Sequence, residues 1–504
     1  MTQTLQTISD HMWEWMAYAA LLLGFYFTFR SRAIQIRRLP DMMKQIAGRQ
    51  VSDGRAKDEH DEGISSFQAL SMTLASRVGV GAIGGVATAI GFGGPGAIFW
   101  MAVTGFVGAA SSYAESVLAQ VYKRKIDGEH RGGIPYYIRY GLGWRWLAAI
   151  AALVAFLAYG FLVPGIQSNN ISNSVSYAFD IPAWITATIV TVILGIVLIG
   201  GTKRIVNVAQ TIVPFMAAGY IIIAIVVILI NITSIPETIS VIFGSAMGVN
   251  QIFGGIAGYA VTWGIRRAIF TSVAGVGEGT FGAAAAHVSH PSKQGLVQAF
   301  SIYVDVLFVC MATGTLIVAT DSYNVITSTG DRIHTNINEA IAAGPEFAQH
   351  AIDTTMHGFG SPFVAVAIFL FAFTSQVAFF YIAQSNLQYL TGQKENKVAT
   401  WILRLGALVI SFIGGVVPAK AMWAAGDIGY ATLGWINMIV ITLLSPIVFK
   451  VHRDYERQRK QGLEPEFDPT SLGIKNAAFW NERYTNIEGR RAQELTNQKN
   501  ISQA

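Results

Sequence analysis

Long apolar runs without a charged residue alternate with short charged segments along most of the chain. The runs at 146–179, 181–201 and 205–236 each reach the roughly 20 residues that a helix needs to cross about 30 Å of hydrocarbon. This pattern is typical of an all-α integral membrane protein. Read along the whole chain, it predicts eleven membrane-spanning helices, at about 12–29, 64–91, 95–122, 144–175, 182–200, 206–231, 252–289 (interrupted), 296–320, 360–390, 398–416 and 424–449.

The composition supports a membrane protein. Of the 504 residues, 52% are hydrophobic and only 13% are charged. In soluble domains, about a quarter of the residues are charged. A soluble core has no use for so many uncharged runs, so a soluble protein is excluded. The one cysteine, Cys310, lies in an apolar run, and a disulfide framework is therefore excluded as well.

Lys and Arg are concentrated in alternate connections between the predicted spans. The segment 30–62 carries eight of them and the segment 123–143 carries five, whereas 1–11 and 232–251 carry none and 321–359 carries only Arg332. Connections rich in Lys and Arg stay in the cytoplasm. With an odd number of spans, this pattern predicts an N-terminus outside the cell and a C-terminus in the cytoplasm. The basic segments then neighbour lipid headgroups, and we do not expect them to bind nucleic acid.

Four segments follow from this division. Residues 1–29 are predicted to form an N-terminal anchor helix, 30–63 a cytoplasmic linker, 64–450 the core, with halves at 64–231 and 252–450, and 451–504 a charge-rich cytoplasmic tail. The first span is not a signal peptide, because Asp10 and Glu14 precede its apolar run, Arg30 follows it, and no cleavage pattern of small residues is present.

Two spans contain clusters of glycine, although each glycine costs a helix up to about 1 kcal/mol relative to alanine. Backbone groups without partners cost several kcal/mol each in lipid, so broken helices survive only against protein or a water-filled cavity. Close helix packing at small residues is an alternative explanation. We predict a break in each span, because the two clusters lie five spans apart, as in an inverted five-plus-five repeat whose discontinuous helices meet near the midplane. The clusters are Gly79, Gly81, Gly84 and Gly85 in the second span and Gly275, Gly277, Gly279 and Gly282 in the seventh.

Seven segments of the chain resemble, in the same order, motifs of the alanine/glycine:cation symporter family. The resemblance covers about residues 64–450. It implies the leucine-transporter fold and uptake of small neutral amino acids, chiefly alanine and glycine, with sodium as the coupling ion and no further cofactor. It also implies alternating access in a prokaryotic plasma membrane. The segments are GVGAIGGVATAIGFGGPGAIFW, YAESVLAQVYK, RGGIPYYI, GIQSNNIS, AAAAHVSHPSKQGLVQ, YVDVLFVCMATG and LFAFTSQVAFFYIAQSNLQYLTG.

The resemblance also implies a site for a zwitterion beside a cation. Free N–H groups at helix N-termini suit the carboxylate, and unwound carbonyls suit the ammonium group or a cation. Gln167 could instead make an interhelical hydrogen bond, and Phe379, where the family usually has Trp, could instead fill the core. The implied substrate residues are Gly79, Val80, Gly81, Ala82, Gln167, Thr271, Ser272, Gly275, Gly277 and Phe379. The implied sodium ligands are the carbonyls of Ala75 and Val78 and the hydroxyls of Thr374 and Ser375.

The two breaks depart from the family pattern. Ala82 and Ser272 stand where the family usually has Asn, and Val273 stands where it usually has Glu. Glu278 follows a few residues later, and an ionisable group in a span indicates function. It could replace the missing carboxylate, carry a coupling proton or pair with a cation. Sodium and proton coupling therefore both stay open.

Three further charged residues belong to this hypothesis. Arg77, just before the first break, is the first candidate partner of Glu278, and Glu115 and Asp305 are others. For Glu115 and Asp305, a structural ion pair or polar lock is the alternative to a role in transport.

The sequence holds no catalytic motif. There is no nucleophile motif, phosphate-binding loop or zinc cluster, and His287 and His290 have no third ligand nearby. We therefore expect no enzyme. A channel and a non-transporting amino-acid sensor are the competing classes, and the sequence leaves the oligomeric state, the stoichiometry and the stereochemistry of the substrate open.

Overall fold

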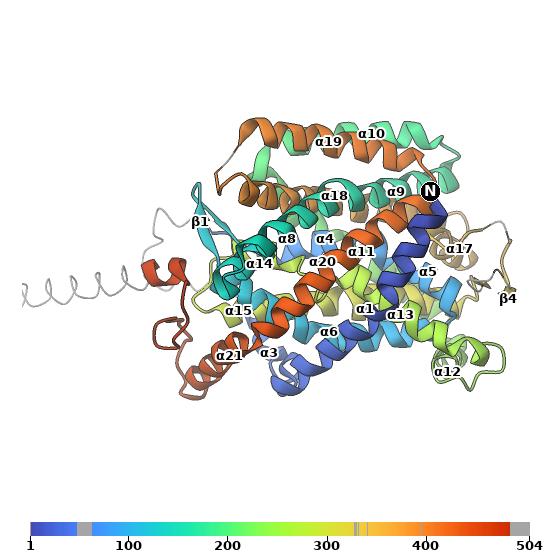
Figure 1. Ribbon diagram of the computed structural model, residues 1–504. Helices are drawn as coiled ribbons and strands as arrows, with labels where there is room; N and C mark the ends of the chain where they lie inside the picture. Colours follow the sequence, from blue (N-terminus) through green and yellow to red (C-terminus); the bar gives the residue numbers. More distant parts are fainter. Residues whose placement is uncertain are drawn as a thin grey trace, which may run out of the picture.

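A computed structural model describes residues 2–47, 63–326, 330, 332–339, 341–394 and 396–483. Most of this part is helical, and the long helices run side by side in one bundle (Figure 1). Every predicted span corresponds to a helix or to a pair of consecutive helices. They are α1 (Thr2–Arg30), α4 (Ser66–Arg77) with α5 (Gly84–Gly93), α6 (Gly96–Val121), α8 (Arg145–Leu157) with α9 (Val163–Phe179), α10 (Ala183–Ile199), α11 (Gly201–Ile230), α13 (Ala257–Ser272) with α14 (Gly279–Ala285), α15 (Pro291–Ile302) with α16 (Met311–Ala319), α18 (Gly360–Leu390), α19 (Lys397–Val416) and α20 (Ala419–Leu443).

In the described part, seven helices are long and apolar enough to cross a membrane on their own. The 17 residues of α10 are too few, α1 is not among the seven, and the interrupted pairs α4–α5 and α13–α14 are too short helix by helix. The protein is thus a multi-pass membrane protein. The count of eleven spans and the inverted repeat stay predictions.

Two of the long spans change their winding without breaking. π-Helical segments join α8 to α9 (Ala158–Leu162) and α15 to α16 (Tyr303–Cys310). A π-helical segment shifts the face that the following residues present, and such segments are frequent at functional sites. The second one carries Asp305, one of the charged residues singled out above. In the packing of the bundle, α6 lies against α13 and α15, and α9 lies against α18 and α19.

The connections at the two ends of the bundle differ as the charge pattern predicts (Figure 1). One end holds the hairpin β1 (Arg124–Ile126) and β2 (Glu129–Arg131), with α3 (Leu39–Ala47) and α21 (Ser445–Lys460). The other end holds the N-terminus, α12 (Ile235–Ala246), α17 (Pro345–Thr355) and the hairpin β3 (Asn324–Ile326) and β4 (Arg332–Thr335). The basic connections lie at the first end. The remaining short helices are α2 (Ile34–Arg37) and α7 (Ile134–Tyr137).

The segment that follows the last span packs against the bundle. Helix α21 runs through the predicted boundary at residue 450. After it, the residues 461–483, here called the C-terminal strap, lie over the basic end. The indole of Trp480 donates to the carbonyl of Gln120 at 2.7 Å, and the backbone amide of Phe467 donates to the carbonyl of Ser289 at 3.0 Å. The predicted tail thus begins as packed structure, and residues 484–504 and part of the linker, 48–62, lie outside the described residues.

Replacing Trp480 with alanine is expected to destabilise the protein by about 3 kcal/mol, because large aromatic side chains leave a cavity when they are truncated in a core. Trp480 is 2% exposed, whereas Trp15 on α1 is 67% exposed. Trp15→Ala is therefore the matched control, with an expected change below about 0.5 kcal/mol. Thermal unfolding of the two purified variants measures the difference, and equal losses would show that the strap does not pack as described.

Candidate functional site

Both predicted breaks are present. Helix α4 ends at Arg77, a single 3₁₀ turn follows at Val80–Ala82, and α5 begins at Gly84. In the second break, α13 ends at Ser272 and α14 begins at Gly279. Gly275 and Gly277 have φ angles of 83° and 95°, which glycine adopts without strain, and Val273 has the unusual φ of 47° for a β-branched residue.

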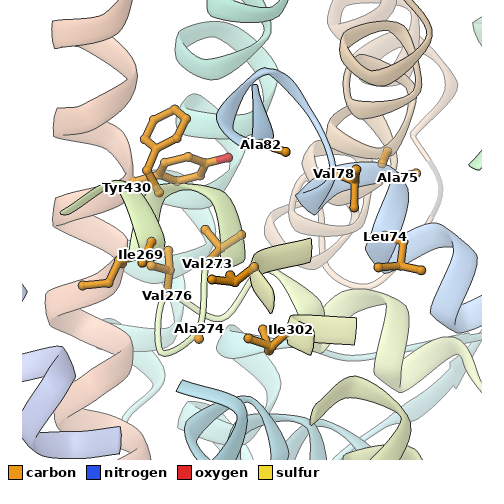
Figure 2. Close-up of a cluster of buried hydrophobic side chains, with 14 of the residues drawn as sticks. Leu74, Ala75, Val78, Ala82, Ile269, Val273, Ala274, Val276, Ile302 and Tyr430 are labelled. Carbon is orange, nitrogen blue, oxygen red and sulfur yellow. The ribbon is translucent and has the colours of Figure 1, made fainter. Parts of the chain in front are cut away.

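The two breaks face one another in the interior of the bundle (Figure 2). A Cβ atom added to Gly81 in the first break would lie 2.9 Å from the Cβ atom of Thr271 at the end of α13. On its other side, the carbonyl of Ala82 accepts a hydrogen bond of 3.0 Å from the hydroxyl of Thr313 on α16. The missing side chain of Gly81 is therefore what lets the two opened segments approach so closely.

Gln167 on α9 contacts the first break. Its side-chain oxygen accepts a hydrogen bond of 3.2 Å from the amide of Val80, one of the groups that the break frees from the helix. A Cβ atom on Gly79 would lie 3.1 Å from the same oxygen. Gln167 thus makes the interhelical hydrogen bond that was its alternative explanation, and it makes this bond to a residue of the implied substrate site.

The implied sodium ligands lie on two elements that meet at the end of α4. The hydroxyl of Ser375 on α18 donates to the carbonyl of Ala75 at 2.8 Å, and the Cβ position of Gly79 is 2.5 Å from the same hydroxyl oxygen. The hydroxyl of Thr374 donates within its own helix, to the carbonyl of Leu370 at 2.9 Å. Ser375 therefore joins the two elements directly, while Thr374 does not contact α4 through its hydroxyl.

Arg77 and three carboxylic acids are buried around the two breaks. The guanidinium of Arg77 lies 3.9 Å from the carboxylate of Glu115 on α6, and it also donates to the hydroxyl of Ser112 at 3.1 Å. Asp305 accepts from the hydroxyl of Thr271 at 3.0 Å. The structure thus pairs Arg77 with Glu115 and not with Glu278, although Arg77 lies near enough to Glu278 and Asp305 for its charge to act on both.

Glu278 lies at the end of the second break, directly before α14, beside a cluster of aromatic residues. The hydroxyl of Tyr430 on α20 donates to Glu278 at 3.1 Å. The ring of Tyr430 packs against those of Tyr159 and Phe270, with centroids 5.7 Å and 5.1 Å away. Phe379 is buried and lies 5.5 Å from Tyr159. It belongs to this aromatic cluster, where it packs as a core residue does. Its role beside a substrate stays a prediction.

Asn437 on α20 is a site residue that the sequence analysis missed. Its side-chain amide donates to the carbonyl of Gly275 at 2.8 Å and to Glu115 at 3.0 Å, and its oxygen accepts from the hydroxyl of Tyr137. It therefore holds the opened backbone of the second break against α6. The signal was available, because Asn437 is an amide in an apolar span, as Gln167 is.

The residues of the implied site come together in this structure. The residues Gly79–Ala82, Gln167, Thr271 and Ser375 surround the first break, and Ser272, Gly275, Gly277 and Glu278 form or flank the second. Freed peptide groups, hydroxyls and charged side chains are brought together here, away from solvent. Such a set can bind a small ion or a zwitterion, because it offers both donors and acceptors.

Comparisons with known proteins identify the family. Residues 1–469 match the sodium:alanine symporter family. The YrbD protein of Bacillus subtilis (strain 168) is 48% identical over 468 residues, which cover 93% of this chain and 95% of that protein. The sodium/proton-dependent alanine carrier protein of Bacillus sp. (strain PS3) is 44% identical over 436 residues, 86% of this chain and 98% of that protein.

Among solved structures, a mutant of the Eremococcus coleocola manganese transporter matches with a TM-score of 0.49 and 12% identity, over 81% of this chain and 90% of that one. This likeness is too weak to support an argument. The family match spans most of the chain, however, and both Bacillus proteins align over nearly all of their length. The chain therefore belongs to the sodium:alanine symporter family, a family of secondary transporters and not of enzymes.

Proposed function

We propose that the protein is a symporter that takes up alanine and glycine together with sodium by alternating access. The observation that carries this proposal is the pair of breaks that face one another in the interior, with Gly81 against Thr271. A channel has no need of two opened helices that close on each other. A zwitterion bound between them would contact both, and its release would require them to separate.

The opened backbone supplies groups of both signs to the substrate. In this proposal, the amides at Gly79–Ala82 bind the carboxylate, and the carbonyls of the second break, at 271–277, bind the ammonium group. Gln167 binds the freed amide of Val80 in the first break, and Asn437 binds the freed carbonyl of Gly275 in the second, so both side chains stabilise the unwound backbone. In this proposal, the preference for alanine rests on the family and on the name of the PS3 relative, an alanine carrier.

Sodium would bind at the end of α4, between the carbonyls of Ala75 and Val78 and the hydroxyls of Thr374 and Ser375. Sodium is a hard cation and prefers oxygen ligands of this kind. The Ser375 hydroxyl already reaches the carbonyl of Ala75, whereas Thr374 must turn away from its own helix to become a ligand. Because the ion and the substrate would share the first break, each would stabilise the conformation that the other needs.

The proposal includes the topology predicted from the sequence. Eleven spans with an inverted repeat would place the breaks near the bilayer midplane, with the N-terminus outside and the basic end in the cytoplasm. One half of the bundle would then rock against the other around the site.

Proton coupling is a second candidate, because three buried carboxylic acids surround one buried arginine at the breaks. The name of the PS3 relative, a sodium/proton-dependent carrier, points in the same direction.

Uptake into liposomes tests the proposal. Purified protein is expected to accumulate radiolabelled alanine when sodium is higher outside, and to show saturable counterflow when alanine is loaded inside, because a carrier binds its substrate on both faces. Glycine is expected to compete, and a large amino acid such as tryptophan is the control that should not. Binding without flux would indicate a sensor, and flux that does not saturate would indicate a channel.

A further inference from the structure

The carboxylic acids around the two breaks outnumber the cations. Glu115, Glu278, Asp305 and Arg77 are all buried, at 0% or 1% exposure. If all four were ionised, one positive charge would face three negative charges away from water. Buried charges that lack a counter-charge are neutralised or offset in folded proteins. At least one of the three acids must therefore hold a proton or contact a bound cation.

The partners of the three acids single out Glu278. Glu115 has a positive partner in Arg77, 3.9 Å from its Oε1, and its Oε2 accepts from the amide of Asn437, while Oε1 has no hydrogen-bond partner among the described residues. Both oxygens of Asp305 lie within 3.2 Å of the hydroxyl of Thr271. Glu278 accepts from Tyr430 through one oxygen, and its other oxygen, Oε1, has no hydrogen-bond partner among the described residues. Glu115 and Glu278 thus each have one oxygen without a hydrogen bond, but of these two acids only Glu115 has a cation within 4 Å. A proton on Oε1 of Glu278 would therefore remove a charge that no ion pair among the described residues offsets.

The position of Glu278 links its charge to the break. It precedes α14, directly after the opened segment, whereas Tyr430 lies on the uninterrupted helix α20, with its ring directed at the breaks (Figure 2). A movement of α14 relative to α20 would separate the phenol from the carboxylate. The proton affinity of Glu278 would therefore change with the conformation of the second break, which is what coupling requires.

The groups that face Glu278 come from every element around it. Two neutral phenols face it, and Arg77 is the cation nearest to it, already paired with Glu115. The groups are Tyr430 on α20, Tyr159 between α8 and α9, Ser76 and Arg77 on α4, Glu115 on α6 and Asp305 between α15 and α16.

We propose that the carboxylate of Glu278 binds a proton that is carried with the substrate, so that a pH gradient can drive uptake as well as a sodium gradient. The proton comes from water at the outer face, adds to a carboxylate oxygen, and returns to water at the inner face, and no other bond is made or broken. This inference rests on the proposed function and names the residue that would carry the second coupling ion.

The test compares two driving forces in the same liposomes. Initial rates of alanine uptake are measured with an inward sodium gradient at equal pH and with an acid exterior in the absence of sodium, with the membrane potential clamped. The readout is the ratio of the pH-driven rate to the sodium-driven rate. For Glu278→Gln this ratio is expected to fall about tenfold or more, because the neutral amide cannot bind and release a proton.

Asp305→Asn is the matched control. It removes an acid from the same cluster, and it is expected to slow both modes together, so that the ratio changes less than about twofold. An unchanged ratio in Glu278→Gln, or a loss of the ratio in Asp305→Asn instead, would overturn the assignment. Wild-type protein that takes up alanine with sodium but never with a pH gradient would also overturn it, while leaving the proposed function intact. Wild-type protein without uptake in either mode would end the proposed function itself.

A second variant keeps the inference testable if Glu278→Gln does not fold. Tyr430→Phe removes the hydroxyl that stabilises the anionic carboxylate. The midpoint of the pH profile of alanine exchange is then expected to move upward by about one pH unit, since the proton is held more tightly. A midpoint that stays in place would contradict the role of Glu278.

Discussion

Gly81→Ala is expected to reduce sodium-driven alanine uptake about tenfold or more. The added methyl group would lie 2.9 Å from the Cβ atom of Thr271 and 3.2 Å from its Cα atom, which is backbone and cannot turn aside. Overpacking of this kind costs about 1–3 kcal/mol, and about 1.4 kcal/mol is enough for a tenfold change in rate. The two breaks would be pushed apart in the conformation in which they close on each other.

Gly85→Ala is the control for this prediction. Gly85 lies one turn further along, in α5, and a Cβ atom there would meet only the Cδ atom of Arg267, at 3.9 Å, an ordinary contact. Alanine also favours the helix that Gly85 belongs to. Initial rates of uptake and the yield of folded protein should be measured for both variants. Similar uptake in the two would mean that the approach of the breaks does not limit transport.

Ser375→Ala is expected to raise the sodium concentration for half-maximal uptake about tenfold, a loss of about 1.4 kcal/mol in binding free energy. The hydroxyl is the group that reaches the carbonyl of Ala75 from α18, so its loss removes one proposed ligand and leaves a space beside another. Uptake is measured against sodium at a fixed, saturating alanine concentration, at which a weaker ion site is distinguished from a slower carrier.

Thr432→Ala serves as the comparison for Ser375→Ala. The hydroxyl of Thr432 donates to the carbonyl of Ile428 within α20, at 2.8 Å, and therefore reports the general effect of removing a helix hydroxyl. Its sodium dependence should match that of the wild type. If Ser375→Ala also keeps the wild-type sodium dependence, sodium does not bind between α4 and α18.

The helices and their breaks could be predicted from the sequence because both follow from local chemistry. Uncharged runs of sufficient length predict spans, and glycines in an apolar run predict interruptions; α4 ends at Arg77 and α13 ends at Ser272 as that reasoning requires. The hydrogen bond of Gln167 to the first break agrees with its place in an apolar span. These inferences need no knowledge of which helices touch.

The partners of the charged residues could not be predicted in the same way. Arg77 pairs with Glu115, and Glu278 meets Tyr430, more than 150 positions away in the chain, because the fold brings α6 and α20 to the breaks. The pattern of one segment contains nothing about the segment that packs on it. The same limit applies to the partners of Asn437, Glu115 and Gly275, although its amide in an apolar span is visible in the sequence.

The packing of the basic end has a practical consequence for shortening the chain. A truncation at residue 450, where the apolar pattern stops, would cut through α21 and strip Phe467 and Trp480 from the surfaces that they cover. The deletion would uncover apolar surface at the ends of α6 and α15 and favour aggregation in detergent. Expression vectors for crystallisation or microscopy should therefore retain the chain through Arg483 and place any cleavable affinity tag beyond it.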